Sequence, residues 1–103
     1  MADEKYNGFT NYETWNLKSW IDNGEPSYKA WRAEAREILA DTPDKLQAVA
    51  DLRDRLQEDT EAGAPEIAPS FYCDALGAAL GRVNYYEIAE MMIDEVIEDG
   101  AGN

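Results

Sequence analysis

The chain has 103 residues, of which 45% are apolar and 11% aromatic, enough large side chains to fill the core of one small domain. Twenty-two acidic residues against nine basic ones leave a net charge of −13, with no histidine. This charge argues against direct binding of DNA, RNA or an anionic membrane, because these surfaces are themselves negative. No apolar run approaches the ~20 residues of a membrane span. The single cysteine, Cys73, suits a reducing compartment, so we expect a cytoplasmic protein.

The first two expected helices lie in the N-terminal 40 residues. Thr10 to Glu13 reads as a Thr-x-x-Glu capping box, so a helix should begin at about Asn11 and run to Asn23. Gly24 can take the left-handed conformation that ends many helices. Pro26 then suits the first turn of a second helix. The apolar residues of this second helix follow helical spacing; they are Tyr28, Trp31, Ala35, Ile38 and Leu39.

Three more helices are expected after residue 40. The run Asp41–Pro43 reads as a stop and restart, a capping residue followed by proline, before a third helix that fades near Thr60. Ser70 can cap a fourth helix, and the segment Asn84–Glu87 repeats the cap-plus-Glu arrangement at the start of a fifth. No stretch alternates with period two. The sequence therefore predicts an all-α bundle of about five short helices and no sheet.

One helical domain should cover residues 9–99, between a loose lead at 1–8 and a frayed tail at 100–103. The stretch 9–24 holds two tryptophans, a phenylalanine and a tyrosine. A small domain needs such side chains to offset chain entropy, so we interpret the cluster as core; an exposed patch that docks a partner is the alternative. The residues expected to be mostly buried are Trp15, Leu17, Trp20, Ile21, Trp31, Ile38, Leu39, Leu76, Leu80, Ile88 and Met92.

Two segments carry a resemblance to a known family. They are "YNGFTNYETWNLKSWIDN", from Tyr6 to Asn23, and, more loosely, "VNYYEIAEMMIDE" near the C-terminus. Together they resemble a family of short acidic proteins with an Asn-Tyr-Glu-Thr-Trp signature, which occurs in phages, mobile elements and archaea. The resemblance implies a viral or mobile-element setting and no particular activity. The signature itself, residues 11–15, makes physical sense as a helix start plus a core anchor.

The usual catalytic and metal-binding patterns are missing from the sequence. The absence of histidine excludes Ser/His and Cys/His pairs, and zinc sites need more Cys or His than the chain has. There is no phosphate-binding loop and no EF-hand pattern. Asp74 disfavours a thiolate at Cys73, which we expect to be a small buried hydrophobe. Carboxylate chemistry stays open on composition, but short helices offer little room for a cleft. We therefore expect a non-enzyme without cofactor or metal.

Carboxylates form two rows at helical spacing. Successive members of a row stand roughly 5–6 Å apart, close to the spacing of phosphates along a nucleic-acid strand. The solvent-exposed face of an amphipathic helix, or the general acidity of proteins from a halophilic organism, would also produce acidic stripes. The acids are uneven, however, because residues 63–103 carry eight acids and one base. This asymmetry favours mimicry of nucleic acid over general salt adaptation. The rows are Asp51, Asp54, Glu58 and Glu61 on the third helix, and Glu87, Glu90, Asp94 and Glu98 on the fifth.

The sequence leads to one functional hypothesis and two alternatives. The hypothesis is a non-enzymatic inhibitor from a phage or mobile element that mimics nucleic acid and blocks a basic host complex of restriction or CRISPR defence. The first alternative is a small adaptor or dimerisation module that docks a protein, a second copy included, through exposed aromatics. The second is a salt-adapted acidic domain. The predicted contact residues are Asp51, Asp54, Glu58, Glu87, Glu90, Asp94, Glu95 and Glu98.

Overall fold

A computed structural model describes residues 5–42 and 44–101, apart from the side chain of Ala101. This part of the chain contains no strand, and only an isolated bridge joins Tyr6 to Phe9. The predicted all-α fold is confirmed. None of the described helices is long and apolar enough to cross a membrane. The helices are α1 (Tyr12–Asn23), α2 (Glu25–Asp41), α3 (Lys45–Ala62), α4 (Phe71–Arg82) and α5 (Tyr85–Ala101).

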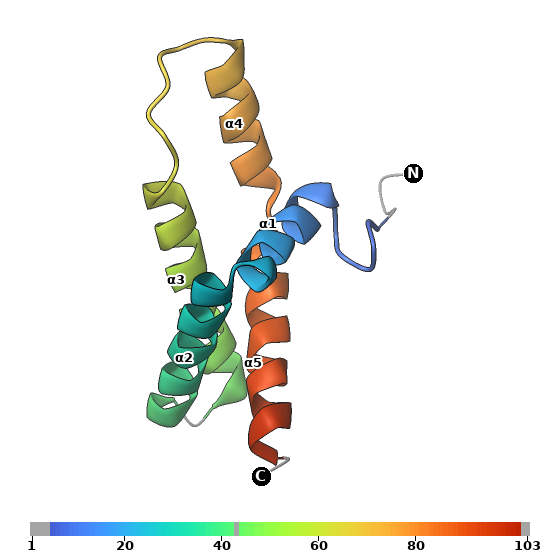
Figure 1. The fold of residues 1–103 in the computed structure, drawn as a ribbon, viewed down its shortest axis with the longest axis vertical. Coiled ribbons are helices and arrows are strands. Elements are labelled where there is room, and N and C mark those ends of the chain that lie inside the picture. Colours follow the sequence, from blue (N-terminus) through green and yellow to red (C-terminus); the bar gives the residue numbers. More distant parts are fainter. Residues whose placement is uncertain (1–4, 43, 102–103) are drawn as a thin grey trace.

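Three helices, α2, α3 and α5, form a bundle, and α1 crosses its upper end (Figure 1). The most extensive contact joins α3 to α5. The loop 63–70 leaves the top of α3, and α4 then descends toward the start of α5 (Figure 1). Because α4 stands above the bundle, the molecule is elongated and measures 49 × 32 × 25 Å.

The hydrophobic core lies between α3 and α5 and is closed by α1 and α2. Leu52, Leu56, Ile88 and Ile93 are fully buried, and each such side chain contributes about 1.5–3 kcal/mol when it leaves water. On α3 the buried positions recur every three or four residues, as expected for a helix with one apolar face. The buried core residues are Ile21, Ala35, Ala48, Val49, Leu52, Leu56, Tyr85, Ile88, Ala89, Met92, Ile93 and Val96. Against it pack the half-buried Leu17, Trp31, Ile38, Leu39 and Val83.

One expected core residue is exposed. Trp20 leaves 73% of its surface in solvent, so the prediction that it is buried was wrong. The reason is the rotation of α1, which turns Thr14, Lys18 and Ile21 inward and leaves Trp20 on the flank beside α4. Two other residues of the predicted core, Leu76 and Leu80 on α4, are half-buried and lie outside the core cluster. Trp15 is half-buried too, whereas Ile21, Ile88 and Met92 are buried as predicted.

The ends of α1 differ from the prediction. Asn11, not Thr10, is the N-cap, and its Oδ1 accepts a hydrogen bond from the Thr14 N–H at 2.9 Å. The Thr10 N–H donates instead to Glu87 Oε1 at 2.9 Å, so the expected capping box does not form. Gly24 has φ −97° and ψ 115°, an extended conformation rather than a left-handed one. The chain therefore passes from α1 into α2 through a single extended residue.

The later helix starts follow the predicted caps in two cases of three. Ser70 Oγ accepts from the Cys73 N–H at 3.2 Å, and Asn84 Oδ1 accepts from the Glu87 N–H at 3.0 Å, so both caps are confirmed. Asp41 is the last residue of α2, and Asp44 caps α3 instead. Pro43 lies outside the described residues, as do residues 1–4 and 102–103 of the expected lead and tail.

Candidate functional site

The signature segment lies against the corner between α4 and α5. Asn11 Nδ2 donates to the Arg82 carbonyl oxygen at 2.8 Å, and the Asn84 N–H donates to Thr14 Oγ1 at 2.9 Å. Thr14 is fully buried, and its own hydroxyl donates to Asn11 Oδ1 at 2.7 Å. The segment around Asn11 is therefore hydrogen-bonded to the end of α4 and to Asn84, which precedes α5. This arrangement gives the signature a structural role as the junction of α1 with the α4–α5 corner.

A tight turn precedes α1 and holds part of the aromatic cluster. Asn7 and Gly8 have φ values of 49° and 88°, and backbone hydrogen bonds of 2.8 Å join Tyr6 and Phe9 in both directions. These are features of the Asn-Gly turn that closes many hairpins. The turn brings the Tyr6 ring 5.0 Å from that of Trp15. This part of the cluster is a local stack beside the core, and the sequence prediction missed it despite the Asn-Gly signal.

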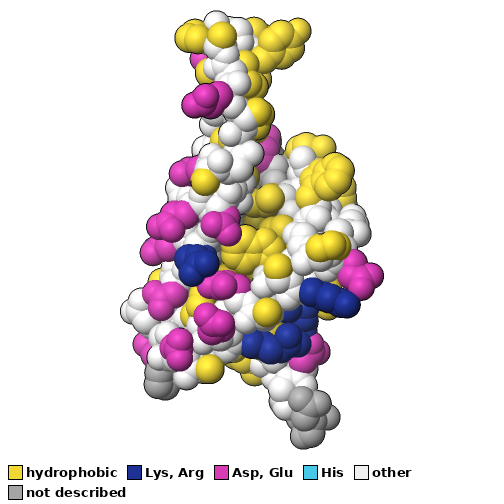
Figure 2. Space-filling view, turned by 60° about the vertical axis from the view of Figure 1, so that its left-hand side comes forward, with side chains coloured by type: hydrophobic (Ala, Val, Ile, Leu, Met, Phe, Trp, Pro, Cys, Tyr) yellow, Lys and Arg dark blue, Asp and Glu magenta, His cyan; other side chains and the backbone are white. Residues whose placement is uncertain are grey.

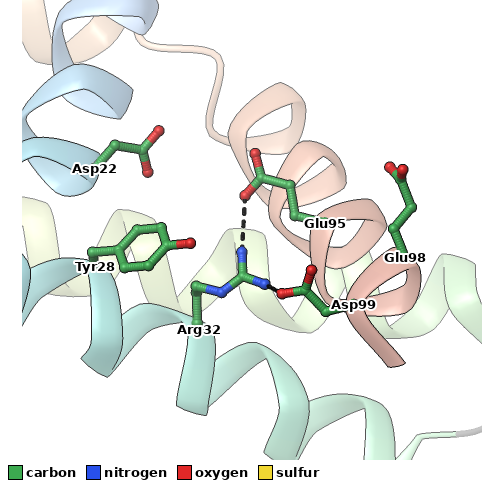
Figure 3. Close-up of a pocket in the computed structure, with 6 residues that line it drawn as sticks. All are labelled: Asp22, Tyr28, Arg32, Glu95, Glu98 and Asp99. Carbon is green, nitrogen blue, oxygen red and sulfur yellow. Dashed lines mark hydrogen bonds and ion pairs between the residues drawn. The ribbon is translucent and has the colours of Figure 1, made fainter. Parts of the chain in front are cut away.

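Buried cations join α1, α2 and α5. Lys18 is only 4% exposed, and its Nζ lies 2.6 Å from Asp22 Oδ2 and 3.3 Å from Glu95 Oε2. Arg32 is 8% exposed and pairs with Glu95 at 3.5 Å and with Asp99 (Figure 3). Sequence reasoning missed both cations, because the acid that pairs with each of them, Glu95, lies more than 60 residues away.

The hollow beside these cations is a weak candidate for a ligand site. It measures about 260 Å³, and Figure 3 shows Tyr28 and Arg32 facing acidic side chains of α5 across it. Both cations already have carboxylate partners, and a buried cation without one would cost several kcal/mol. Within residues 5–42 and 44–101, no group of three or more Asp, Glu or Cys side chains is arranged to hold a metal ion. We therefore interpret the cluster as a clamp between helices.

Most of the predicted contact carboxylates have partners within the chain. Ion pairs occupy three of them, and hydrogen bonds from a side chain or the backbone occupy two more. The pair with Asp94 also raises the pKa of Lys45, chiefly through the hydrogen bond between them. A partnered carboxylate is less available to an outside cation. The five are Asp51 with Gln47, Asp54 with Arg53, Glu87 with the Thr10 N–H, Asp94 with Lys45, and Glu95 with Lys18 and Arg32.

Three predicted contact residues remain available. Glu58, Glu90 and Glu98 are exposed, and in the described part of the chain they make no ion pair or side-chain hydrogen bond. Figure 2 shows acidic side chains spread over the lower body, with lysine and arginine side chains among them. The two rows are therefore interrupted by internal pairs and do not form one continuous track of unpaired charge.

The most exposed aromatic side chains lie on α1 and α4. Trp20, Phe71 and Tyr72 are 73%, 76% and 71% exposed. Between the two helices runs a groove of about 260 Å³ with mostly apolar walls. In Figure 2, hydrophobic side chains gather at the narrow upper end of the molecule and in the hollow below it. We call these three aromatics and the groove the α1–α4 surface; the groove is lined by Glu13, Asn16, Leu17, Trp20, Thr60, Leu76, Ala79, Leu80 and Val83.

An ion pair ties the two walls of the groove together. Arg82 Nε, at the end of α4, lies 3.2 Å from Glu13 Oε1 on α1. A backbone hydrogen bond and, to a lesser degree, this guanidinium hold the pKa of Glu13 below its usual value of 4.5. The pair fixes the base of α4, while its N-terminal end projects with Phe71 and Tyr72 exposed.

The composition of α4 carries a sequence signal for this surface. The run from Phe71 to Gly81 contains one charged residue, Asp74. A surface helix normally carries a polar outer face opposite its apolar stripe. Because α4 lacks a polar face, its sequence indicates a helix that is covered by other protein rather than by solvent alone.

The fold and this surface together define a small, acidic, all-α protein with an uncovered apolar face. Residues 2–99 match the model of a family of unknown function (DUF7249), so the chain belongs to that family. No curated protein and no solved structure matches the chain.

Proposed function

We propose that this protein is a non-enzymatic interaction module that docks a protein partner through the α1–α4 surface. The observation that carries the proposal is that α4, a helix of 12 residues, has no buried residue. Isolated helices of this length are marginal in water. Gly77 and Gly81 weaken α4 further, by about 1 kcal/mol each relative to alanine. A helix so poorly covered gains stability when a partner packs on it.

The composition of the surface supports protein docking. Tryptophan and tyrosine are enriched among the residues that dominate binding energy in protein interfaces, and they cluster in patches that lose water on binding. Here Trp20 lines an apolar groove, and Phe71 and Tyr72 are exposed at the N-terminal end of α4. Monomeric proteins rarely expose a contiguous apolar patch beyond a few hundred Å² without a function for it.

A selection from displayed helical peptides tests this function. We expect the purified protein to select peptides with apolar residues at positions i, i+3, i+4 and i+7, the pattern that suits an apolar groove. The double variant Phe71→Ser/Tyr72→Ser should lose them. The matched control is Leu46→Ser, because Leu46 is also 67% exposed but lies at the start of α3. The selection is made at a protein concentration at which the chain is monomeric, and equal binding by the double variant, or no selected peptide, would then refute the proposal.

A second candidate function is nucleic-acid mimicry by an inhibitor from a phage or mobile element, acting in the host cytoplasm. Its support is the net charge of −13 and three carboxylates that have no ion pair among the described residues, Glu58, Glu90 and Glu98. These residues would contact a basic groove of a restriction or CRISPR complex, with binding that weakens as salt rises.

Competition with duplex DNA tests the second candidate. The protein should displace DNA from a purified restriction endonuclease or CRISPR complex at low salt, and the triple variant Glu58→Gln/Glu90→Gln/Glu98→Gln should displace at least tenfold less. The partnered residue Asp94 is a poor choice for this test, because its loss would also leave Lys45 without its ion pair. Unchanged displacement by the triple variant would exclude these carboxylates as the contact.

A further inference from the structure

We infer that the partner of the α1–α4 surface is a second copy of this chain, so that the protein forms a two-fold dimer through α4. This inference rests on the proposed docking function and names the occupant of the same surface. Three properties of the molecule lead to it: the size of the apolar surface, the distribution of charge and the shape of the groove.

The apolar area suits one side of a stable protein interface. A large aromatic side chain buries about 150–250 Å² when fully covered. With Trp20, Phe71 and Tyr72 exposed by 73%, 76% and 71%, the three together offer roughly 330–550 Å². One side of a standard interface buries about 800 Å², of which a little over half, about 450 Å², is apolar. The surface therefore supplies the apolar part of such an interface without any rearrangement of the core.

The distribution of charge selects a second copy over a basic partner. Residues 63–83 contain two acids and one base, whereas residues 84–99 contain six acids and no base. A basic partner would gain more from the acidic body than from α4. Two copies, each with a charge of −13, repel each other unless their bodies stay apart.

The shape of the molecule allows the bodies to stay apart. α4 stands at one end of the 49 Å long axis, above the bundle that carries most of the acids (Figures 1 and 2). Two copies joined through α4 place their bundles at opposite ends of the dimer. Charges farther apart than the Debye length, about 8 Å at physiological salt, are largely screened.

The groove has room for an aromatic side chain of the second copy. Its volume of about 260 Å³ exceeds the roughly 150 Å³ that admits a benzene molecule in a protein cavity. If two α4 helices pack antiparallel, the N-terminal end of each lies beside the C-terminal end of the other. Phe71 or Tyr72 of one copy then reaches the groove between α1 and α4 of its partner. Two-fold symmetry makes the same contact twice, as an isologous interface requires.

Sedimentation equilibrium over a range of protein concentrations tests the dimer. We expect a mass that rises from 11.6 kDa to twice that value, with a midpoint at about micromolar concentration or below. Dimerisation should be at least as strong at about 0.5 M salt as at low salt, because salt screens the repulsion between the bodies. A complex held by charge would show the opposite dependence.

Two variants on different helices keep the test decisive. Phe71→Ser/Tyr72→Ser on α4 and Trp20→Ser on α1 should each raise the dissociation constant at least about tenfold, while Leu46→Ser leaves it unchanged. All these positions are exposed, so circular dichroism should report an intact fold for every variant. A mass of 11.6 kDa at all concentrations overturns the dimer. If peptide selection by the same surface succeeds in that case, the docking function stands with a different partner; if it fails too, both are refuted.

Discussion

Thr14 is the residue on which the junction between α1 and the α4–α5 corner depends most. Its buried hydroxyl accepts from the Asn84 N–H and donates to Asn11 Oδ1. A buried polar group that loses its partner costs about 1–3 kcal/mol. Asn11 and Thr14 thus have a structural role at this junction.

Replacement of Thr14 by valine should therefore destabilise the protein by about 1–3 kcal/mol, because valine keeps the shape but leaves the Asn84 N–H without an acceptor. Urea denaturation measures the change. The control is Thr14→Ser, which retains the hydroxyl and removes one methyl group, worth about 0.8 kcal/mol. Equal losses for valine and serine would show that the hydroxyl contributes nothing.

Glu95 and Glu98 lie on the same helix but differ in role: Glu95 is a structural carboxylate and Glu98 is a solvated one. Glu95 pairs with Lys18 and Arg32, whereas Glu98 lines the same hollow without an ion pair among the described residues. Glu95→Gln should lower the free energy of unfolding by about 1–3 kcal/mol, because the buried cations lose part of their compensation. Glu98→Gln should change it by less than about 0.5 kcal/mol. Thermal denaturation of both variants checks this, and similar losses would contradict the clamp.

At the scale of the element, α4 differs from the other four helices because it is held mainly by its base. Its main contact with another helix is with α1, reinforced by the ion pair of Arg82 with Glu13 and by the hydrogen bond from Asn11 to the Arg82 carbonyl. The N-terminal half of α4 has little to pack against. Its stability in the monomer should therefore be limited by intrinsic helix propensity.

Gly77→Ala should increase the protection of α4 backbone amides from hydrogen exchange about two- to fivefold, corresponding to 0.5–1 kcal/mol of added helix stability. A methyl group at Gly77 meets no atom within 4 Å, so no clash opposes the gain. The experiment is made at low protein concentration. Gly8→Ala is the contrasting variant, because Gly8 has a φ of 88° that alanine adopts only with strain. Unchanged α4 protection in Gly77→Ala would mean that propensity does not limit this helix.

Local signals in the sequence predicted the elements well and their exposure less well. Local spacing predicts the caps at Ser70 and Asn84 and the apolar stripes of α3 and α5, because these features depend on residues three or four apart. The exposure of Trp20 depends on how α1 crosses the bundle, which no local pattern encodes. The burial of Lys18 depends on an acid 77 residues away.

The candidate site illustrates the same limit. The carboxylate rows were predicted from spacing alone, but a cation from another helix, such as Lys45 of α3 beside Asp94 of α5, could not be assigned in advance. Docking through exposed aromatics was expected only as an alternative, and that expectation rested on residues 9–24 rather than on Phe71 and Tyr72, since aromatic side chains suit a core as well as an interface. What decides between core and interface is whether another helix covers them, and α4 is not covered.

At the scale of the whole molecule, acid and apolar surface are separated along the long axis. The bundle carries most of the charge that keeps copies apart, and the α1–α4 surface, with few charges, extends from α1, at the upper end of the bundle, to the N-terminal end of α4 (Figures 1 and 2). This polarity permits self-association of a protein with a charge of −13 without bringing the acidic bundles together.

Hydrogen exchange of the α4 amides at low and high protein concentration tests this account most directly. In the monomer α4 has no buried residue, so its amides should exchange well before those of α3 and α5. Above the dissociation constant of the dimer, we predict that protection of residues 71–82 rises at least tenfold, while that of α3 and α5 changes little. An α4 as protected as the core at low concentration, or one whose exchange is the same at every concentration, would contradict the account.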